Sequence, residues 1–260
     1  MQSLIEINDL VVNACHGVLD FEKKEEQPFV FNCKIDIDFL QAAKDDDLNK
    51  TISYCDIMQD ISDFCKSHTF NLIETLAYKT ALMLLNKYDM IKSINLNVKK
   101  PEAPYGLTFK NVGVDVNLSW HTSFLSLGSN LGDREATLLK AIEQLNSDEI
   151  IVVKKSSFYK NAPYGGVATE EFVNMAVEIK TIYSPHQLLN RIHEIEASLG
   201  RVRDVHWGNR TIDIDIVFYD NITLNTEELT IPHKDYKNRD FVLVPLSEIA
   251  PYIIEPQQNS

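Results

Sequence analysis

Arginine is absent from the first 120 residues of this 260-residue chain, and all six arginines lie after residue 121. The first half therefore takes its positive charge from lysine alone. Because the planar guanidinium group is the preferred two-pronged partner of phosphate oxygens, this asymmetry suggests two modules with different chemical tasks. The length is sufficient for two compact domains. The hydrophobic and charged fractions, 44% and 24%, are ordinary for a globular protein.

Cysteine, basic charge and long apolar runs are also scarce. The four cysteines form no Cys-x-x-Cys pair, which excludes the common zinc and redox motifs and favours a reduced, cytoplasmic setting. A net charge of -13 argues against nucleic-acid binding. No apolar run approaches a membrane span, and residues 1–7 lack the pattern of a secretory signal. We therefore expect a cytoplasmic protein with no nucleic-acid or membrane partner.

Residues 200–216 contain the most informative pattern of the chain. They carry three arginines: Arg201, Arg203 and Arg210. They end in a predicted strand, Ile-Asp-Ile-Asp-Ile, on which Asp213 and Asp215 share one face. Two adjacent carboxylates repel each other, and oxygen ligands beside arginines suit Mg²⁺ that carries nucleotide phosphates. The alternative is an edge strand with a solvated acidic face.

Hydrophobic periodicity predicts the secondary structure of the first half. Strands are expected after residue 4 and over 28–40, helices over 54–67 and 72–88, and strands over 91–99 and 109–118. An antiparallel sheet with both helices on one face satisfies this order. Its exposed edges could be covered by association between subunits.

Several spaced motifs lie on this scaffold: His16-Gly17-Val18, Glu22, Gln27-Pro28-Phe29, Tyr54, Leu72-Ile73-Glu74-Thr75-Leu76-Ala77 and Lys99-Lys100-Pro101-Glu102-Ala103-Pro104. Taken singly, each polar residue has an ordinary explanation, such as a helix-dipole carboxylate for Glu74. Together the motifs, spread over about residues 1–118, resemble dihydroneopterin aldolase. The resemblance implies a tunnelling fold that assembles as a tetramer or octamer, with active sites between subunits.

The same resemblance implies the chemistry of the first half. Such enzymes cleave the side chain of dihydroneopterin to glycolaldehyde and hydroxymethyl-dihydropterin without a metal or other cofactor. Lys100 and Tyr54 would be the acid and base, Glu22 would bind the hydroxylated side chain, and Ile73 and Glu74 would bind the pterin. Related zinc enzymes need several histidines, and this half has only His16 and His68, so a zinc site is excluded.

The second half has the order strand, helix, strand, strand, helix, strand, which predicts a ferredoxin-like α+β domain. The expected strands cover 124–127, 150–159, 172–180 and the Asp213/Asp215 segment, and the expected helices cover 134–145 and 185–199. Gly128-Ser129-Asn130-Leu131-Gly132 lacks the Gly-Lys-Ser/Thr of a P-loop, so a Walker-type cradle is excluded and a plain loop is expected. The domain boundary is expected near residues 119–123, giving domains 1–119 and 122–260.

A second set of motifs spans about residues 122–256: the Gly128–Asp133 loop, Ser156-Ser157-Phe158-Tyr159, Phe172-Val173-Asn174, Ile195-Glu196, Gly200–Arg203, Trp207-Gly208, Arg210, Asp213-Ile214-Asp215, Pro232-His233, Lys237-Asn238-Arg239 and Phe241. Together they resemble hydroxymethyl-dihydropterin pyrophosphokinase, which moves diphosphate from ATP to the pterin and releases AMP. Lys234 stands where many members carry a tyrosine, and Phe172 stands where some members do.

The resemblance assigns residues in this half as well. Asp213 and Asp215 would hold two Mg²⁺ ions. Arg201 and Arg210 would be catalytic cations, and the ATP-binding residues would be Glu196, Arg203, Trp207, His233 and Arg239. Phe172, Asn174 and Phe241 would bind the pterin. Since one reaction would make the substrate of the other, we expect a bifunctional folate-biosynthesis enzyme. The alternatives are a noncatalytic pterin- or nucleotide-binding module and an RNA-binding ferredoxin-like sheet, which the net charge disfavours.

Overall fold

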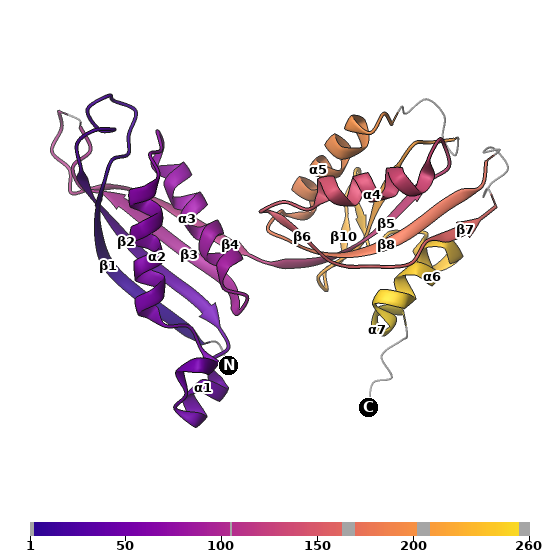
Figure 1. The fold of residues 1–260 in the computed structure, drawn as a ribbon, viewed down its shortest axis with the longest axis horizontal. Coiled ribbons are helices and arrows are strands. Elements are labelled where there is room, and N and C mark those ends of the chain that lie inside the picture. Colours follow the sequence, from indigo (N-terminus) through magenta and orange to yellow (C-terminus); the bar gives the residue numbers. More distant parts are fainter. Residues whose placement is uncertain (1–2, 105, 163–169, 202–208, 255–260) are drawn as a thin grey trace. The chain divides into compact units, whose positions relative to one another are not determined.

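The computed structural model describes residues 3–104, 106–162, 170–201 and 209–254. The chain divides into two compact units, Met1–Trp120 and His121–Ser260. Both are mixed α+β units, as expected (Figure 1). No helix within the described residues is long and apolar enough to cross a membrane.

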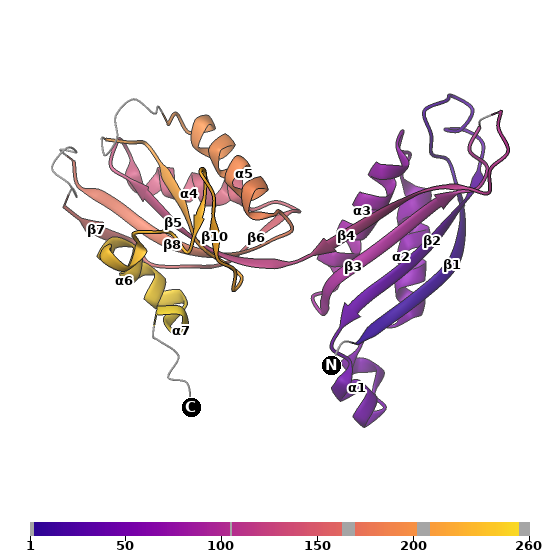
Figure 2. The ribbon, with the colours of Figure 1, turned by 180° about the vertical axis from the view of Figure 1, so that it is seen from behind.

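The first unit is a four-stranded antiparallel sheet in the order β1-β2-β3-β4. Its elements are β1 (Leu4–Ala14), β2 (Gln27–Ile37), α1 (Leu40–Asp45), a short 3-10 turn (Leu48–Lys50), α2 (Tyr54–Ser67), α3 (Ile73–Lys87), β3 (Ile91–Lys100) and β4 (Val112–Ser119). Alternate residues of β2 from Phe29 to Ile37 are buried, because they face the helices. The two long helices lie on one side of the sheet in both views (Figures 1 and 2).

Helix α2 begins where its sequence provides a cap. The hydroxyl oxygen of Ser53 accepts a hydrogen bond from the Asp56 N–H at 3.4 Å, which satisfies a free amide of the first turn. The predicted strand over 28–40 is wrong at its end, since β2 stops at Ile37 and α1 starts at Leu40. The Asp38 carboxylate accepts the Leu40 N–H at 3.1 Å and turns the chain there.

The second unit contains β5 (His121–Ser129), α4 (Arg134–Leu145), β6 (Ile150–Lys155), β7 (Tyr159–Asn161), β8 (Phe172–Thr181), α5 (Pro185–Ser198) and β9 (Asp213–Tyr219). Its sheet order, β6-β8-β5-β9, places β5 and β8 in the middle, and β7 also pairs with β8. The order of elements confirms the expected alternation of strands and helices. The predicted strand over 150–159 is two strands, because Ser156 and Ser157 interrupt it.

Both faces of this second sheet are covered. Helices α4 and α5 bury Leu138, Ala141, Leu145, Leu188, Ile192 and Ile195 against one face. The other face is covered by α6 (Asp240–Ile249), through Val242, Leu246 and Ile249. Figure 2 shows α6 and α7 (Pro251–Ile254) on the side opposite α4 and α5. Between β9 and α6 lie a hairpin of β10 (Leu224–Asn225) and β11 (Thr230–Ile231) and a 3-10 turn (Tyr236–Asn238).

Candidate functional sites

The first unit has a pocket of about 320 Å³ at the end of β3. It is lined by the loop between β1 and β2, the first turn of α3 and the chain beyond β3. Glu22, Ile73, Glu74 and Lys100, four of the five residues predicted for this half, are among the lining residues. The fifth, Tyr54, is the first residue of α2, is 61% exposed and does not line the pocket.

Lys100 and Glu22 form a buried ion pair at the floor of this pocket, with 8% and 3% of their surfaces exposed. The Lys100 ammonium group also donates to the His16 carbonyl oxygen at 3.3 Å. The Glu22 carboxylate accepts the Leu19 N–H at 2.9 Å. Burial acts to raise the pKa of Glu22, but hydrogen bonds from Lys100 and Leu19 outweigh it, and the pKa falls below its usual value. Glu22 is therefore ionised and held in place beside the Lys100 ammonium group.

Gly17 allows the Glu22 carboxylate to reach this position. Its φ of 152° lies in a region that favours glycine, and a Cβ atom placed there would lie 2.3 Å from the Glu22 Cδ atom. The neighbouring His16 ring is buried and accepts the Phe70 N–H at 3.1 Å, while its Nε2 lies 3.2 Å from Cys65 Sγ. Burial lowers the pKa of His16 to about 4. Both residues belong to a predicted motif, but sequence reasoning gave neither a role.

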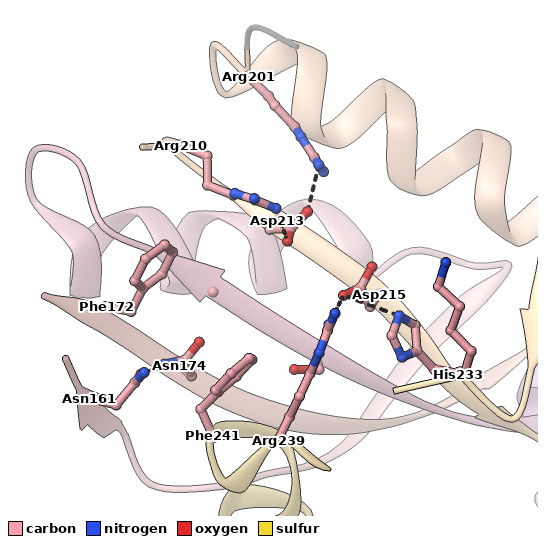
Figure 3. A pocket seen from close by; sticks show the side chains of 13 residues that line it. Asn161, Phe172, Asn174, Arg201, Arg210, Asp213, Asp215, His233, Arg239 and Phe241 are labelled. Carbon is pink, nitrogen blue, oxygen red and sulfur yellow. Dashed lines mark hydrogen bonds and ion pairs between the residues drawn. The ribbon is translucent and has the colours of Figure 1, made fainter. Parts of the chain in front are cut away.

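The second unit has a pocket of about 270 Å³ over β5, β8 and β9. Asp213, Asp215 and three arginines lie in one part of it, and two aromatic rings lie in another (Figure 3). The lining residues are Ser126, Gly128, Asn161, Phe172, Asn174, Arg201, Arg210, Asp213, Asp215, His233, Lys234, Arg239 and Phe241. Nine of the twelve residues predicted for this half are in that set.

Asp213 and Asp215 point to the same side of β9 but have different surroundings. Asp213 pairs with Arg210 and, at 2.6 Å, with Arg201. Within the described residues, the Asp215 carboxylate lies 3.8 Å from the Arg239 guanidinium group and 3.9 Å from the His233 Nε2 atom. Burial, followed by the charge of Asp213, raises the pKa of Asp215 to about 7. The charge of Asp213 thus acts against ionisation of Asp215, and a cation bound nearby would favour it.

This carboxylate pair fits Mg²⁺. The described residues contain no group of three or more His, Cys, Asp and Glu side chains able to hold a metal ion. Mg²⁺ needs only one or two carboxylates, because it retains waters and takes substrate phosphates as further ligands. Two oxygen donors on one strand face, open to a pocket lined by arginines, match that requirement.

Glu196 stands behind the pocket rather than in it. Its side chain on α5 is 1% exposed. The carboxylate pairs with Arg201 and accepts the Ile214 N–H at 2.8 Å. Burial raises the pKa of Glu196, although Arg201 opposes this effect. Glu196 thus links Arg201 to the backbone of β9 between the two aspartates.

Asn130 anchors the backbone of Arg210, and sequence reasoning missed it. The Asn130 side-chain oxygen accepts the Arg210 N–H at 2.7 Å. Its amide nitrogen donates to Asn209 Oδ1 at 2.7 Å. Asn130 lies in the Gly128–Gly132 loop, which was interpreted as a plain connection because it lacks a phosphate-loop pattern. The signal available in the sequence was the asparagine itself, whose side-chain oxygen can accept a backbone N–H.

His233 and Arg239 line the pocket next to Asp215. The His233 Nδ1 accepts the Asp235 N–H at 3.2 Å, which leaves Nε2 facing Asp215. Burial, followed by the charge of Arg239, lowers the pKa of His233. At neutral pH His233 therefore offers an N–H donor, and the positive charge comes from Arg239. Arg203 and Trp207, also predicted to bind ATP, lie outside the described residues.

Phe172, Asn174 and Phe241 lie together at the other end of the pocket, with Asn174 between the two rings (Figure 3). The Asn174 amide nitrogen donates to Asn161 Oδ1 at 2.6 Å. A Cβ atom on Gly128 would lie 2.8 Å from the Asn174 side-chain oxygen, so glycine is needed for their close approach. Asn161, on β7, was not predicted because the expected strand ended at Tyr159.

Comparisons with known families divide the chain in the same way. Residues 124–251 match the family model of 7,8-dihydro-6-hydroxymethylpterin-pyrophosphokinase, and residues 5–117 match that of dihydroneopterin aldolase. The chain is 45% identical over 133 residues to the 2-amino-4-hydroxy-6-hydroxymethyldihydropteridine pyrophosphokinase of Methylorubrum extorquens, covering 51% of this chain and 84% of that protein.

Longer relatives also match. The chain is 49% identical over 129 residues to the bifunctional protein FolKE of Lactococcus lactis, covering 49% of this chain and 37% of that protein. It is 29% identical over 279 residues to the folic acid synthesis protein FOL1 of Dictyostelium discoideum, covering 97% of this chain and 42% of that protein. The chain thus spans less than half the length of these relatives. A crystal structure of E. coli dihydroneopterin aldolase in complex with neopterin aligns with 30% identity and a TM-score of 0.41, covering 44% of this chain and 97% of that one.

Proposed function

We propose that this chain catalyses two consecutive reactions of folate biosynthesis. Through residues 124–251 it belongs to the 7,8-dihydro-6-hydroxymethylpterin-pyrophosphokinase family, and residues 5–117 form a dihydroneopterin aldolase domain. In the first, 7,8-dihydroneopterin is cleaved to 6-hydroxymethyl-7,8-dihydropterin and glycolaldehyde. In the second, the hydroxymethyl group receives diphosphate from ATP, and AMP is released. We assign the reactions to domains 1–119 and 122–260.

The aldolase reaction needs a held pterin and positioned proton-transfer groups. A base removes the proton of the second side-chain hydroxyl, the bond between the first and second side-chain carbons breaks, and the electron pair enters the ring C=N bond. An acid then protonates the first carbon. Lys100 is suited to proton transfer, because it is buried and fixed by Glu22 and the His16 carbonyl group. Glu74 and Ile73 would hold the pterin, and Glu22 the side-chain hydroxyls.

Tyr54 can take part in the aldolase reaction only if several copies of the chain associate. It does not line the pocket of its own chain, so we propose that a second copy supplies it within a homotetramer or homo-octamer. In the described residues, β1 and β4 each pair on one side only, which leaves two edges for association. A native mass of four or eight times 29.7 kDa is expected. A monomer that is fully active as an aldolase would contradict this assembly.

In the second reaction the hydroxymethyl oxygen loses its proton to solvent and bonds to the β-phosphorus of ATP, while the bond from that phosphorus to the oxygen bridging the α- and β-phosphates breaks, so that AMP leaves with that oxygen. We propose that Asp213 and Asp215 hold two Mg²⁺ ions. When bound, Mg²⁺ neutralises phosphate charge and lowers the barrier to attack. Arg201, Arg210 and Arg239 would bind phosphate oxygens, His233 would donate through Nε2, and Phe172, Asn174 and Phe241 would orient the pterin. Arg203 and Trp207 complete the assignment to ATP, and the buried Glu196 would act on ATP only by positioning Arg201.

One observation supports this second activity most strongly. A pair of carboxylates, three arginines and a ring-binding end with two aromatic side chains and an amide line one pocket. A pterin between Phe172 and Phe241 would present its substituent along the pocket toward β9. The arrangement thus brings a flat ring and a metal-bound polyphosphate together, as transfer between them requires.

Separate assays test the two activities. With hydroxymethyl-dihydropterin, ATP and Mg²⁺, the chain should release AMP, and Asp213→Ala should abolish that release without affecting glycolaldehyde formation from dihydroneopterin. Lys100→Ala should have the opposite effect. If the unaltered chain binds both ligands and forms neither product, it is a noncatalytic binding module and the proposal is wrong.

A further inference from the structure

The cationic side chains of the second pocket differ in whether a carboxylate already neutralises them. Arg201 pairs with Glu196 and Asp213, and Arg210 pairs with Asp213. Arg239 lies 3.2 Å from Asp235 and 3.8 Å from Asp215. Lys234 also lines the pocket, but no carboxylate in the described part of the chain pairs with it.

The backbone around Lys234 is held in place. The His233 N–H donates to the Val217 carbonyl oxygen at 3.0 Å, and the Tyr236 N–H donates to the His233 carbonyl oxygen at 3.2 Å. The neighbouring carboxylate, Asp235, is occupied by Arg239. Lys234 is therefore fixed at the pocket by its main chain, while its exposed side chain retains a free positive charge.

Lys234 follows His233 directly in the chain, and both residues line the pocket together with Asp215. The His233 Nε2 lies 3.9 Å from the Asp215 carboxylate. Because Lys234, His233 and Asp215 line the same pocket, the lysine charge can act on a ligand bound there.

We propose that Lys234 binds an oxygen of the β- or γ-phosphate of the incoming nucleotide beside His233. This inference rests on the proposed transfer from ATP and adds a residue to it. The paired arginines must exchange a carboxylate for phosphate when the nucleotide binds, whereas Lys234 gains an ion pair without losing one. Its contribution to nucleotide affinity is therefore less reduced by competition within the pocket. As a positioning residue it would act on the polyphosphate and not on the pterin.

The test compares four single variants: Lys234→Gln, which removes the charge, Lys234→Arg, which keeps it, Lys234→Glu, which reverses it, and Lys237→Gln as the matched control. Lys237 is an exposed lysine three residues further along that packs over the Tyr236 ring and does not line the pocket. Calorimetry would measure the binding of Mg²⁺ with α,β-methylene-ATP, which cannot break at the bond cleaved in the reaction, and of AMP, which lacks the β- and γ-phosphates.

Lys234→Gln should weaken binding of the ATP analogue about tenfold, the usual size of a lost charge-assisted contact. Its affinity for AMP and for hydroxymethyl-dihydropterin should stay within about twofold of that of the unaltered chain. Lys234→Glu should weaken analogue binding further, Lys234→Arg should preserve it, and Lys237→Gln should have no effect. The loss in Lys234→Gln should also shrink at high salt, because ions screen an exposed contact.

Two results would overturn the inference. Equal binding of the analogue to Lys234→Gln and Lys237→Gln, with AMP release intact in the unaltered chain, would contradict the role of Lys234 alone. An equal loss for AMP and for the analogue would show that the contact is not with the added phosphates. If the unaltered chain does not bind the analogue, both this inference and the proposed ATP reaction fail.

Discussion

Asn130 and Arg210 are joined by two hydrogen bonds although they lie 80 residues apart in the sequence. The Asn130 side-chain oxygen accepts the Arg210 N–H at 2.7 Å, and the Asn130 N–H donates to the Arg210 carbonyl oxygen at 3.2 Å. The loop after β5 thus fixes the main chain from which the Arg210 guanidinium group reaches Asp213.

Removal of the Asn130 side chain should therefore impair the pyrophosphokinase reaction. Asn130→Ala leaves the Arg210 N–H without its acceptor, and we expect kcat/KM for AMP release to fall about ten- to a hundredfold. Asn130→Asp keeps an acceptor and should recover part of the loss. Steady-state AMP assays would measure both. Unchanged kcat/KM in Asn130→Ala would show that Arg210 does not depend on this anchor.

Asn161 should affect the pterin and not the nucleotide. Its side-chain oxygen holds the amide of Asn174 at 2.6 Å, and Asn161→Ala frees that amide to rotate. We expect KM for hydroxymethyl-dihydropterin to rise about tenfold while KM for ATP stays the same. Asn161→Asp retains the acceptor and serves as the matched control. A parallel rise of both KM values would indicate a general loosening of the unit.

Gly17→Ala should disable the aldolase site, because the added methyl group would overlap the Glu22 carboxylate and displace it from Lys100. Displacing a positioned group by about 1 Å commonly costs about a hundredfold in rate, so a loss of that size in glycolaldehyde release is expected. Gly106→Ala is the control, since within the described residues no atom other than those of its chain neighbours lies within 4 Å of a Cβ at Gly106. Release of AMP should be normal in both variants. Normal aldolase activity in Gly17→Ala would contradict the packing described.

His16 should make the first unit sensitive to acid. Its pKa is about 4 in the folded unit and 6.5 as the ordinary value. Between these two pH values the unfolded chain binds more protons at His16 than the folded unit does. The free energy of unfolding is thus highest, as far as His16 is concerned, above about pH 6.5. It decreases by up to about 3 kcal/mol as the pH falls toward 4.

This loss can be measured by urea unfolding at several pH values in a Trp207→Phe background. Trp120 is then the only tryptophan, and its ring N–H contacts the Leu85 carbonyl oxygen within the first unit at 3.4 Å. His16→Gln should flatten the pH dependence, and His68→Gln, at an exposed position, should change it little, because His68 contributes least to the lowered pKa of His16. An equal dependence in His16→Gln would show that another group causes it.

Local signals predicted much of the fold. The helix over 54–67 was predicted correctly from the helical spacing of apolar residues such as Ile57 and Ile61, both of which are buried. The helix over 134–145 follows Asp133, whose carboxylate accepts the Ala136 N–H at 3.2 Å. Helix α6 was missed, and Pro245 within it argues against a helix in any local pattern. The break between β6 and β7 was also missed, because Ser157 donates to Glu248, 91 residues away.

The residues of the candidate site were likewise predicted where local signals sufficed and missed where contacts with distant segments decide. Asp213 and Asp215 could be placed on one face from strand alternation alone, and the family motifs named Phe172, Asn174 and Phe241, which lie in the same pocket. Asn130 and Asn161 were missed because each acts through a hydrogen bond to a distant segment. The position of Tyr54 outside its own chain's pocket could not be derived from the order of elements.

The most direct test of the whole account is a coupled assay in which the purified chain receives only dihydroneopterin, ATP and Mg²⁺. Glycolaldehyde and AMP should both appear, with AMP following after a lag. Lys100→Ala should form little of either product, and added hydroxymethyl-dihydropterin should restore its AMP release alone. If AMP appears in Lys100→Ala without that addition, or if the unaltered chain releases glycolaldehyde but no AMP, the two sites do not act in sequence.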